Sequence, residues 1–258
     1  MNLVDTHCHI DVAAFDVDRT EVLDRCRSSG VTRIVVPGIM ANSWEKLQKT
    51  CDANPGLYAS FGLHPVYLDQ HSSDDIDALS ERVQHQRPIA VGEIGLDYFL
   101  DGLDRDRQKS LFQAQLMVAK NASLPVLLHV RKSHDDVLSL LRKTKVCGGI
   151  CHAFNGSLQQ AQQYIDLGFK LGFGGMLTFD RSHKLHHLAQ QLPLEAIVLE
   201  TDAPDMTGAS HHGQRNSPEY LPEYLAALAS IRKEDVELVA AQTTANAEFV
   251  LDFSRTNI

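Results

Sequence analysis

Histidine and carboxylate side chains recur along this sequence at spacings that suit metal-ion chemistry. His7 and His9 flank Cys8 directly after a short apolar run near the first residue. Residues i and i+2 of an extended chain point to the same face, so two such imidazoles can converge on one ion while Cys8 points the other way. An isolated pair of this kind is more often two hydrogen-bonded histidines at a strand end than a metal site. The pair therefore needs partners elsewhere in the chain.

Residues of the same types stand at the ends of several other apolar runs. Eight runs rich in branched side chains can be recognised, and six of them end in or are followed by ionisable residues: His7 and His9, His64, Glu93, His129, His152 and Asp202. Ionisable side chains are costly to place beside a packed core unless they have partners. Their shared position favours a common metal site over a set of unrelated polar residues.

The elements that would position these residues alternate between strand and helix. Apolar runs predict strands over 3–7, 33–38, 57–64, 88–95, 125–130, 148–154, 169–175 and 196–202. Amphipathic stretches predict helices that include 18–29, 42–53, 106–122, 133–145, 157–167, 182–192, 218–231 and 234–251. Ser157 is suited to the N-cap of one helix, and Gly168 to its C-terminal cap.

Strand and helix alternation with short turns requires parallel strands. Eight such units in 258 residues predict a (β/α)8 TIM barrel, an α/β fold forming a single domain over 1–258. A doubly wound open sheet is the alternative, although no linker marks the second domain that it would need. In a barrel the active site lies at the carboxyl ends of the strands, which is where the ionisable residues stand.

Composition narrows the classes of function. The formal net charge of −9 argues against broad adhesion to a polyanion, because proteins that neutralise many phosphates have basic surfaces. Five cysteines without a CxxC pair indicate free thiols in a reducing compartment, with Cys8 and Cys151 as packing residues. The start of the chain does not resemble a signal peptide, and no apolar run is long enough to span a membrane. We therefore expect a cytoplasmic protein that acts away from membranes, of undetermined oligomeric state, with a monomer compatible with the sequence.

The number of candidate ligands predicts two metal ions. Four imidazoles and two carboxylates exceed what one zinc ion needs while a position stays open for water. They suit two ions that share a bridging carboxylate about 3.5–4 Å apart. We assign His7, His9, Glu93 and Asp202 to one ion and Glu93, His129 and His152 to the other. Nitrogen and oxygen ligands without thiolate fit Zn, Mn, Fe or Co, and the second position also fits Mg.

Seven motifs in register resemble the TatD family of metal-dependent deoxyribonucleases, and within it the YjjV-like branch. They are VDTHCHID at the start, GLHP (62–65), GEIGLDY (92–98), PVLLHVR (125–131), CHAFNGS (151–157), ETDAPD (200–205) and HGQRNSPEYLP (212–222). The resemblance covers nearly the whole chain and implies a barrel of the metallo-dependent hydrolase superfamily. It also implies hydrolysis of DNA phosphodiesters, 3′ to 5′ on single strands, and the same six ligands. Ala203 stands where the family often has Ser, which affects substrate preference rather than ligation.

A mechanism follows as a hypothesis. A hydroxide bridged by the two metal ions would attack the phosphorus, and Asp202 would accept the proton from the water that forms it. Positive charge in the cleft would attract the phosphate that an acidic surface repels, which predicts short or single-stranded DNA ends as substrate. His64, Arg131 and Arg215 are candidates for holding the phosphate. A salt bridge at the barrel mouth and a solvated loop charge are the competing interpretations of the two arginines.

Some residues and functions stay open at this stage. Glu200 is a candidate for orienting a ligand or a structural buried carboxylate, His134 has no assigned role, and the segment 203–217 suits a rim over the site. A binuclear hydrolase of another ester or amide bond, such as a lactone or aminoacyl-RNA, is the alternative function. A non-enzymatic binding protein is the remaining class, but a ligand set with room for water argues against it because structural zinc sites are usually closed.

Overall fold

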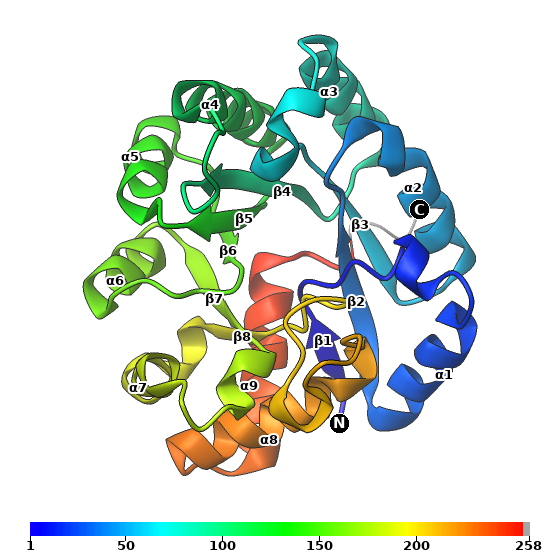
Figure 1. The fold of residues 1–258 in the computed structure, drawn as a ribbon, viewed down its shortest axis with the longest axis vertical. Helices are drawn as coiled ribbons and strands as arrows, with labels where there is room; N and C mark the ends of the chain where they lie inside the picture. The colour runs from blue at the N-terminus through cyan, green and yellow to red at the C-terminus, as the bar shows by residue number, and fades with distance from the viewer. Residues whose placement is uncertain (255–258) are drawn as a thin grey trace.

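Eight strands pair side by side in the order of the sequence, all parallel, in the computed structural model, which describes residues 1–254 (Figure 1). They are β1 (Leu3–Asp5), β2 (Val31–Pro37), β3 (Leu57–Phe61), β4 (Ala90–Asp97), β5 (Val126–Arg131), β6 (Gly149–Cys151), β7 (Phe169–Phe173) and β8 (Ile197–Leu199). The ring closes where Thr6 N donates to Leu199 O at 3.0 Å. The predicted TIM barrel is confirmed, and the open sheet is excluded because its strand order would depart from the order of the sequence.

Helices surround the ring of strands. They are α1 (Arg19–Ser29), α2 (Trp44–Ala53), α3 (Asp74–Gln86), α4 (Arg105–Ala122), α5 (His134–Thr144), α6 (Leu158–Asp166), α7 (His183–Gln191), α8 (Leu221–Arg232) and α9 (Val236–Val250). The predicted cap of α6 is confirmed, since Ser157 Oγ accepts from Gln160 N at 3.1 Å and Gly168 follows the helix with φ 84°. The sequence prediction did not single out α3.

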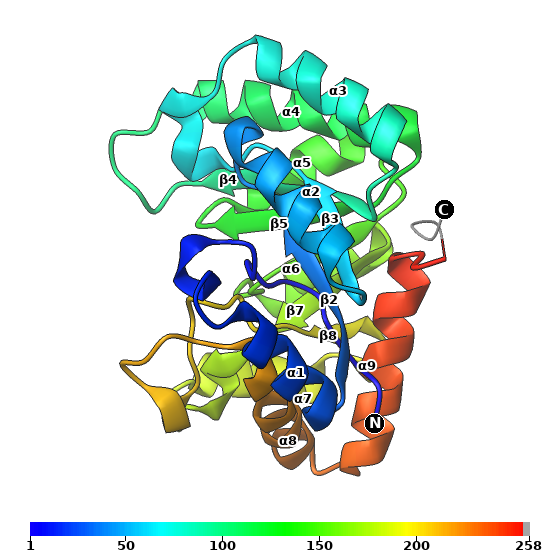
Figure 2. The same ribbon diagram turned by 90° about the vertical axis from the view of Figure 1, so that its right-hand side faces the viewer.

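The core has two apolar layers, as the continuous apolar strands require. One layer lies between the strands and the surrounding helices. A smaller cluster fills the barrel at the amino ends of the strands, where Ala247, Leu251 and Phe253 at the end of α9 pack against Val4 and Val198. Figure 2 shows α9 at that end and the loops after β4 and β8 at the opposite end. One mouth of the barrel is thus closed by side chains and the other is left to polar loops.

Six of the strands end earlier than the apolar runs predicted, whereas β4 and β5 end two residues and one residue later. β1 ends at Asp5 and β6 at Cys151, so His7, His9 and His152 lie just beyond the paired segments. The alternation of side chains nevertheless continues past the last ladder position, because Cys8 is fully buried in the layer that faces the helices. The predicted outward direction of Cys8 is therefore confirmed.

Two further sequence expectations concern cysteines and membranes. The five cysteines form no disulfide with one another, and Cys147 alone among them is exposed. Within residues 1–254, no helix combines the length and the apolar character that crossing a membrane demands.

Candidate metal centre

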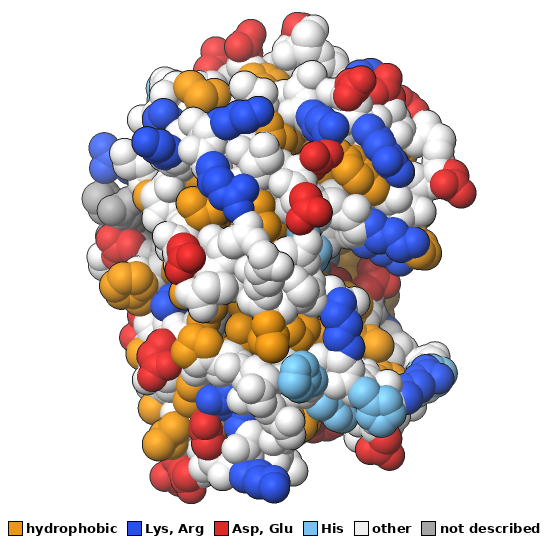
Figure 3. All heavy atoms as spheres, turned by 90° about the vertical axis from the view of Figure 1, so that its left-hand side faces the viewer, with side chains coloured by type: hydrophobic (Ala, Val, Ile, Leu, Met, Phe, Trp, Pro, Cys, Tyr) orange, Lys and Arg blue, Asp and Glu red, His pale blue; other side chains and the backbone are white. Residues whose placement is uncertain are grey.

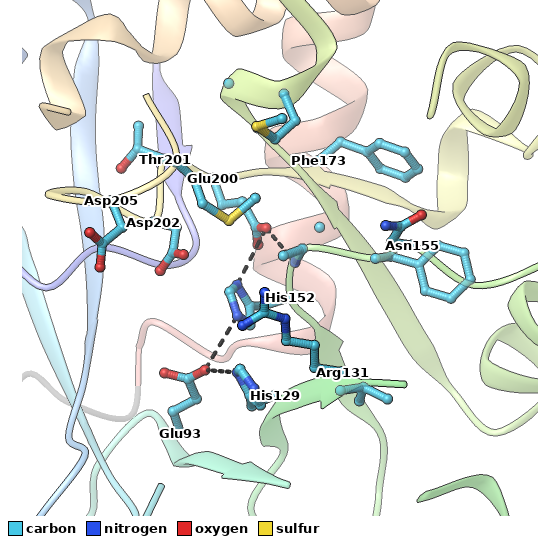
Figure 4. A pocket seen from close by; sticks show the side chains of 18 of the residues that line it. Glu93, His129, Arg131, His152, Asn155, Phe173, Glu200, Thr201, Asp202 and Asp205 are labelled. Atoms are coloured by element: carbon cyan, nitrogen blue, oxygen red, sulfur yellow. Dashed lines mark hydrogen bonds and ion pairs between the residues drawn. The ribbon is translucent and has the colours of Figure 1, made fainter. Parts of the chain in front are cut away.

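The six predicted ligands converge at the open mouth of the barrel around the Glu93 carboxylate. Figure 4 shows Glu93, His129, His152 and Asp202 among them. Its Oε2 lies 3.3 Å from His7 Nε2 and 3.5 Å from His9 Nε2. Its Oε1 lies 3.0 Å from His129 Nδ1 and 3.3 Å from His152 Nε2. Each oxygen of one carboxylate thus faces a different pair of histidines, which is the arrangement of a bridging ligand.

Asp202 completes the pair of histidines that follows β1. Its Oδ1 lies 3.6 Å from His7 Nε2 and 3.7 Å from His9 Nε2. The residue adopts a left-handed backbone with φ 57°, and its N–H donates to His7 O at 2.8 Å. Such a backbone costs a non-glycine residue on the order of 1 kcal/mol, and the surrounding structure must enforce it. The junction between β1 and β8 therefore holds this carboxylate against the two histidines.

The nitrogen atoms at the centre fit a divalent cation. Both ring nitrogens of His7 are buried, and neither forms a hydrogen bond with the described residues. Buried polar atoms without partners are rare in native proteins, and a metal ion is one of the explanations. Possible ligand atoms form three groups, and the atoms within each group lie within 4.8 Å of one another. The groups are His7, Glu93 and His152; His7, His9 and Asp202; and His64, Glu93 and His129. Imidazole and carboxylate donors of this kind bind Zn, Mn, Fe and Co.

The pKa values of the buried groups differ across the site. Burial raises the pKa of Glu93, but the imidazoles of His64, His7 and His152 lower it more, so that its pKa lies well below the ordinary value. Burial lowers the pKa of His7 to about 3, which keeps its imidazole neutral. Burial also raises the pKa of Asp202 to about 6. Burial lowers the pKa of His9, His129 and His152, but the neighbouring carboxylates, Glu93 among them, raise it more, so that it lies above the ordinary value. Metal ions bind carboxylates and neutral imidazoles, so binding at these three histidines would release protons.

Asp97 orients His129, and the sequence analysis assigned it no role. His129 Nε2 lies 3.0 Å from Asp97 Oδ2, and Nδ1 lies 3.0 Å from Glu93 Oε1. We assign the proton of the neutral ring to Nε2, which then donates to Asp97 and leaves the lone pair of Nδ1 for a metal ion. The other carboxylate oxygen, Asp97 Oδ1, accepts from Phe99 N at 2.8 Å and from Leu100 N at 3.2 Å. Metal-binding histidines commonly donate their second N–H to a carboxylate in this way. Asp97 stands four residues after Glu93 on β4, a spacing that places both on one strand face.

Glu200 has the comparable place beside His152. Its Oε1 lies 3.6 Å from His152 Nδ1 and accepts from Ala153 N at 2.6 Å. A side chain on Gly172 would not fit here, since its Cβ would lie 2.0 Å from Glu200 Oε2. The lack of a side chain at Gly172 therefore makes room for this carboxylate. Of the two interpretations of Glu200, the geometry favours the one in which it orients a ligand.

His64 presents a donor to the centre. Its Nδ1 accepts from Val66 N at 3.1 Å, so the proton of the neutral ring is assigned to Nε2. Nε2 lies 3.2 Å from Glu93 Oε1. A nitrogen that carries a proton cannot ligate a metal ion, but it can donate to a carboxylate or to a phosphate oxygen. This geometry supports the predicted contact of His64 with substrate.

A cavity of about 910 Å³ opens over these residues. Arg131, Lys132 and Lys184 supply its cationic lining, while Asp202 and Asp205 lie on the β8 side, across the cavity from Arg131 in Figure 4. The first residues of the predicted rim, Pro204 to Met206, also line it. On the face drawn in Figure 3, basic side chains are interspersed with acidic ones and form no continuous field. Attraction of an anion is therefore local to the cavity.

His134 also lines the cavity, away from Glu93. Its Nδ1 lies 3.2 Å from Tyr164 Oη, and its ring meets Phe154 edge to face with centroids 5.4 Å apart. Burial lowers the pKa of His134 to about 4, with a smaller contribution in the same direction from Lys184. The neutral ring packs where α5 and α6 meet rather than with the metal-binding histidines.

The structure does not bring Arg215 to the cavity. Its guanidinium donates to both oxygens of Asp18 at 2.8 and 2.7 Å and lies 4.3 Å from the centroid of the Phe15 ring. It also donates to Ala14 O at 2.6 Å. These contacts fasten the segment 203–217 to the chain that follows β1. Arg215 thus has the geometry of an anchor, and its predicted contact with phosphate finds no support in this arrangement.

The chain is similar to known proteins over nearly its whole length. A family model described as TatD related DNase matches residues 4–252. The chain is 39% identical over 240 residues to the metal-dependent hydrolase YjjV of Escherichia coli (strain K12), with 92% of this chain and 93% of that protein covered. It is 32% identical over 251 residues to the 3′-5′ ssDNA/RNA exonuclease TatD of Klebsiella pneumoniae (strain 342), with 95% of each covered. The crystal structure of Escherichia coli YjjV matches with a TM-score of 0.94 and 37% identity, over 97% of this chain and 98% of that one.

Proposed function

The chain belongs to the TatD-related DNase family of metal-dependent hydrolases, and from this premise we propose that it cleaves DNA phosphodiester bonds with two divalent metal ions. The substrate is the end of a short or single strand, degraded from 3′ to 5′. The similarity to a 3′-5′ ssDNA/RNA exonuclease over 95% of the chain supports this polarity and this class of substrate.

The proposal rests on the Glu93 carboxylate, whose two oxygens face two different sets of predicted ligands. Oε2 faces His7 and His9, with Asp202 beside them, while Oε1 faces His129 and His152. Divalent cations held by these residues would supply Lewis acidity and would make a water molecule nucleophilic near neutral pH.

The side chains of this protein have distinct tasks in the reaction. Asp202 stands at the edge of the ligand set and accepts the proton of the attacking water. His64 donates its Nε2 proton to a phosphate oxygen, and Arg131 at the cavity wall adds a second donor whose planar fork matches phosphate. Asp97 and Glu200 hold His129 and His152 in the orientation that ligation needs.

The distribution of charge favours strand ends over duplex DNA. The formal net charge is −9, and the cations that line the cavity are Arg131 and Lys132 at the end of β5 and Lys184 on α7. A protein of this kind offers no basic surface along which a duplex could lie. We also propose a cytoplasmic location and metal ions drawn from Zn, Mg, Mn, Fe and Co, as the sequence predicts.

The test is incubation of metal-replete protein with single-stranded DNA labelled at the 5′ or the 3′ end. We expect progressive shortening from the 3′ end, abolition by a chelator, and a loss of more than about 100-fold in Glu93→Ala, since loss of outer-shell partners alone costs about 10–100-fold. Glu195→Ala, which removes an exposed carboxylate outside the cavity lining, is the matched control. Hydrolysis of a lactone or an aminoacyl ester without cleavage of DNA under any divalent metal would overturn the proposal.

A further inference from the structure

Three side chains, one aromatic and two cationic, form part of the cavity wall. The proposed reaction gives a role to only one of them, Arg131. Phe99 stands on the loop after β4, while Arg131 and Lys132 follow one another at the end of β5. All three line the cavity. Arg131 Cζ lies 3.7 Å from the centroid of the Phe99 ring, and Lys132 Nζ lies 4.7 Å from it. We call these three residues the β4–β5 wall.

The β4–β5 wall is not explained by folding. Phe99 keeps 46% of its surface exposed, although a buried position would stabilise the fold more. Neither Arg131 nor Lys132 forms an ion pair with a carboxylate in residues 1–254, so their charge is not neutralised locally. Lys132 also has a left-handed backbone with φ 54°, which is uncommon for a residue with a side chain. Unfavourable backbone geometry of this kind often accompanies a functional requirement.

The carboxylate of Asp97 links the β4–β5 wall to one of the predicted metal ligands. Asp97 accepts the backbone N–H of Phe99 with one carboxylate oxygen and the ring N–H of His129 with the other. Arg131 follows His129 by two residues on β5, and the register of the sheet pairs Arg131 with Asp97. One carboxylate thus sets the position of a ligand and of the wall together. A substrate held at Glu93 would meet the wall with its next residue.

An exposed aromatic ring beside unpaired cations matches the chemistry of a nucleotide. Bases stack on aromatic rings and on guanidinium planes without much regard to sequence, and cations contact the phosphates between them. A base in a duplex is already stacked and cannot reach such a platform. The opposite side of the cavity carries Asp205, whose carboxylate repels a phosphate backbone. The strand therefore has one favourable direction in which to leave the centre.

We propose that the β4–β5 wall is a subsite for the nucleotide next to the scissile bond of a single strand. The base stacks on the Phe99–Arg131 pair, and Lys132 contacts the following phosphate. This inference rests on the proposed nuclease function and deepens it, because it names the part of the substrate that the site recognises beyond the phosphodiester itself.

The test compares two substrates of the metal-loaded enzyme. One is an oligothymidylate about ten nucleotides long, within the range that single-strand grooves bind. The other is methyl 4-nitrophenyl phosphate, a diester without a neighbouring nucleotide. For Phe99→Ala we expect kcat/KM on the oligothymidylate to fall about 5- to 10-fold more than on the small diester, the lower range for the loss of one base–aromatic stack. Phe99→Trp should restore the difference.

A salt series gives a second readout that a structural role would not change. Lys132→Ala should reduce the slope of log kcat/KM against log salt concentration on the oligothymidylate by about 0.7, the value for one lost phosphate contact on a single strand. Phe249→Ala is the matched control, because Phe249 is an exposed aromatic with Lys170 Nζ 5.1 Å from its ring, outside the cavity lining. It should change neither readout.

The outcomes separate the two proposals. Equal losses on both substrates in Phe99→Ala, or an unchanged salt slope in Lys132→Ala, would overturn the subsite while the nuclease function stands. Hydrolysis of the small diester by the wild-type enzyme without cleavage of the oligothymidylate would overturn the nuclease function, and the subsite with it.

Discussion

The substitution Asp97→Asn tests how the second metal position is held. Asp97 Oδ2 accepts the proton on His129 Nε2, while Oδ1 accepts the N–H groups of Phe99 and Leu100. An asparagine keeps one oxygen for the two backbone donors and turns its NH2 group toward the ring. Two facing donors repel, so the imidazole would carry its proton on Nδ1, the atom that faces Glu93. A protonated Nδ1 cannot ligate.

The expected effect is a loss of affinity for one ion. Removal of an outer-shell partner of a metal-binding histidine costs about 10–100-fold in affinity, or about 1.4–2.7 kcal/mol. The distance of 3.0 Å and the burial of Asp97, which is 1% exposed, place this case at the upper end. The ion beside His7 and His9 has no contact with Asp97 in this arrangement, so its affinity should be retained.

Calorimetric titration of metal-free protein with Mn²⁺, together with metal analysis at a buffered free concentration, measures both affinities. Asp104→Asn is the matched control, because Asp104 caps α4 through Asp106 N and Arg107 N, a role that asparagine fills equally well. Binding of two ions by Asp97→Asn with the affinities of the wild-type protein would refute the assignment of His129 as a ligand through Nδ1.

Three further substitutions test the surroundings of the site. The pKa of His134 is lowered to about 4 in the folded protein, so between about pH 6.5 and 4 this histidine binds a proton in the unfolded chain but not in the folded one. The free energy of unfolding therefore falls as the pH drops from about 6.5 to 4. His134→Gln should remove up to about 3 kcal/mol of that dependence, measured by urea unfolding of both proteins across this range. Arg215→Ala breaks the pair with Asp18 and should lower the free energy of unfolding by about 1 kcal/mol or less. It should leave KM for single-stranded DNA unchanged, and a tenfold rise in KM would instead return Arg215 to the substrate site. Asn216→Ala removes a fully buried amide and should cost about 2–4 kcal/mol in urea unfolding. The exposed Asn155→Ala should cost little, and equal losses would contradict the role of Asn216 in fastening the loop.

The spacing of residues predicted the ligand set because strand geometry is local. A period of two placed His7 and His9 on one face and Cys8 on the other, and the rule that barrel chemistry lies at carboxyl ends brought five strand ends together. The same period could have identified Asp97, four residues beyond Glu93 on the same strand. Asp97 lies two residues beyond the apolar run 88–95, so a prediction based on the ends of the runs did not include it.

Tertiary contacts explain what the sequence did not reveal. Arg215 pairs with Asp18, 197 residues earlier, because the loop after β8 folds back over the chain that follows β1. No local pattern encodes such a partner. Helix α3 begins with three acidic residues in its first turn, and its apolar stripe is short, with Leu79 and Val83 as its buried residues. Such a helix has a weaker periodic signal than α5 or α6.

Anomalous diffraction from crystals soaked in Mn²⁺ tests the central claim most directly. We expect two peaks about 3.5–4 Å apart with the Glu93 carboxylate between them. One should lie among His7, His9 and Asp202, and the other beside His129 and His152. A single peak at full occupancy, or two peaks that do not share Glu93, would contradict it.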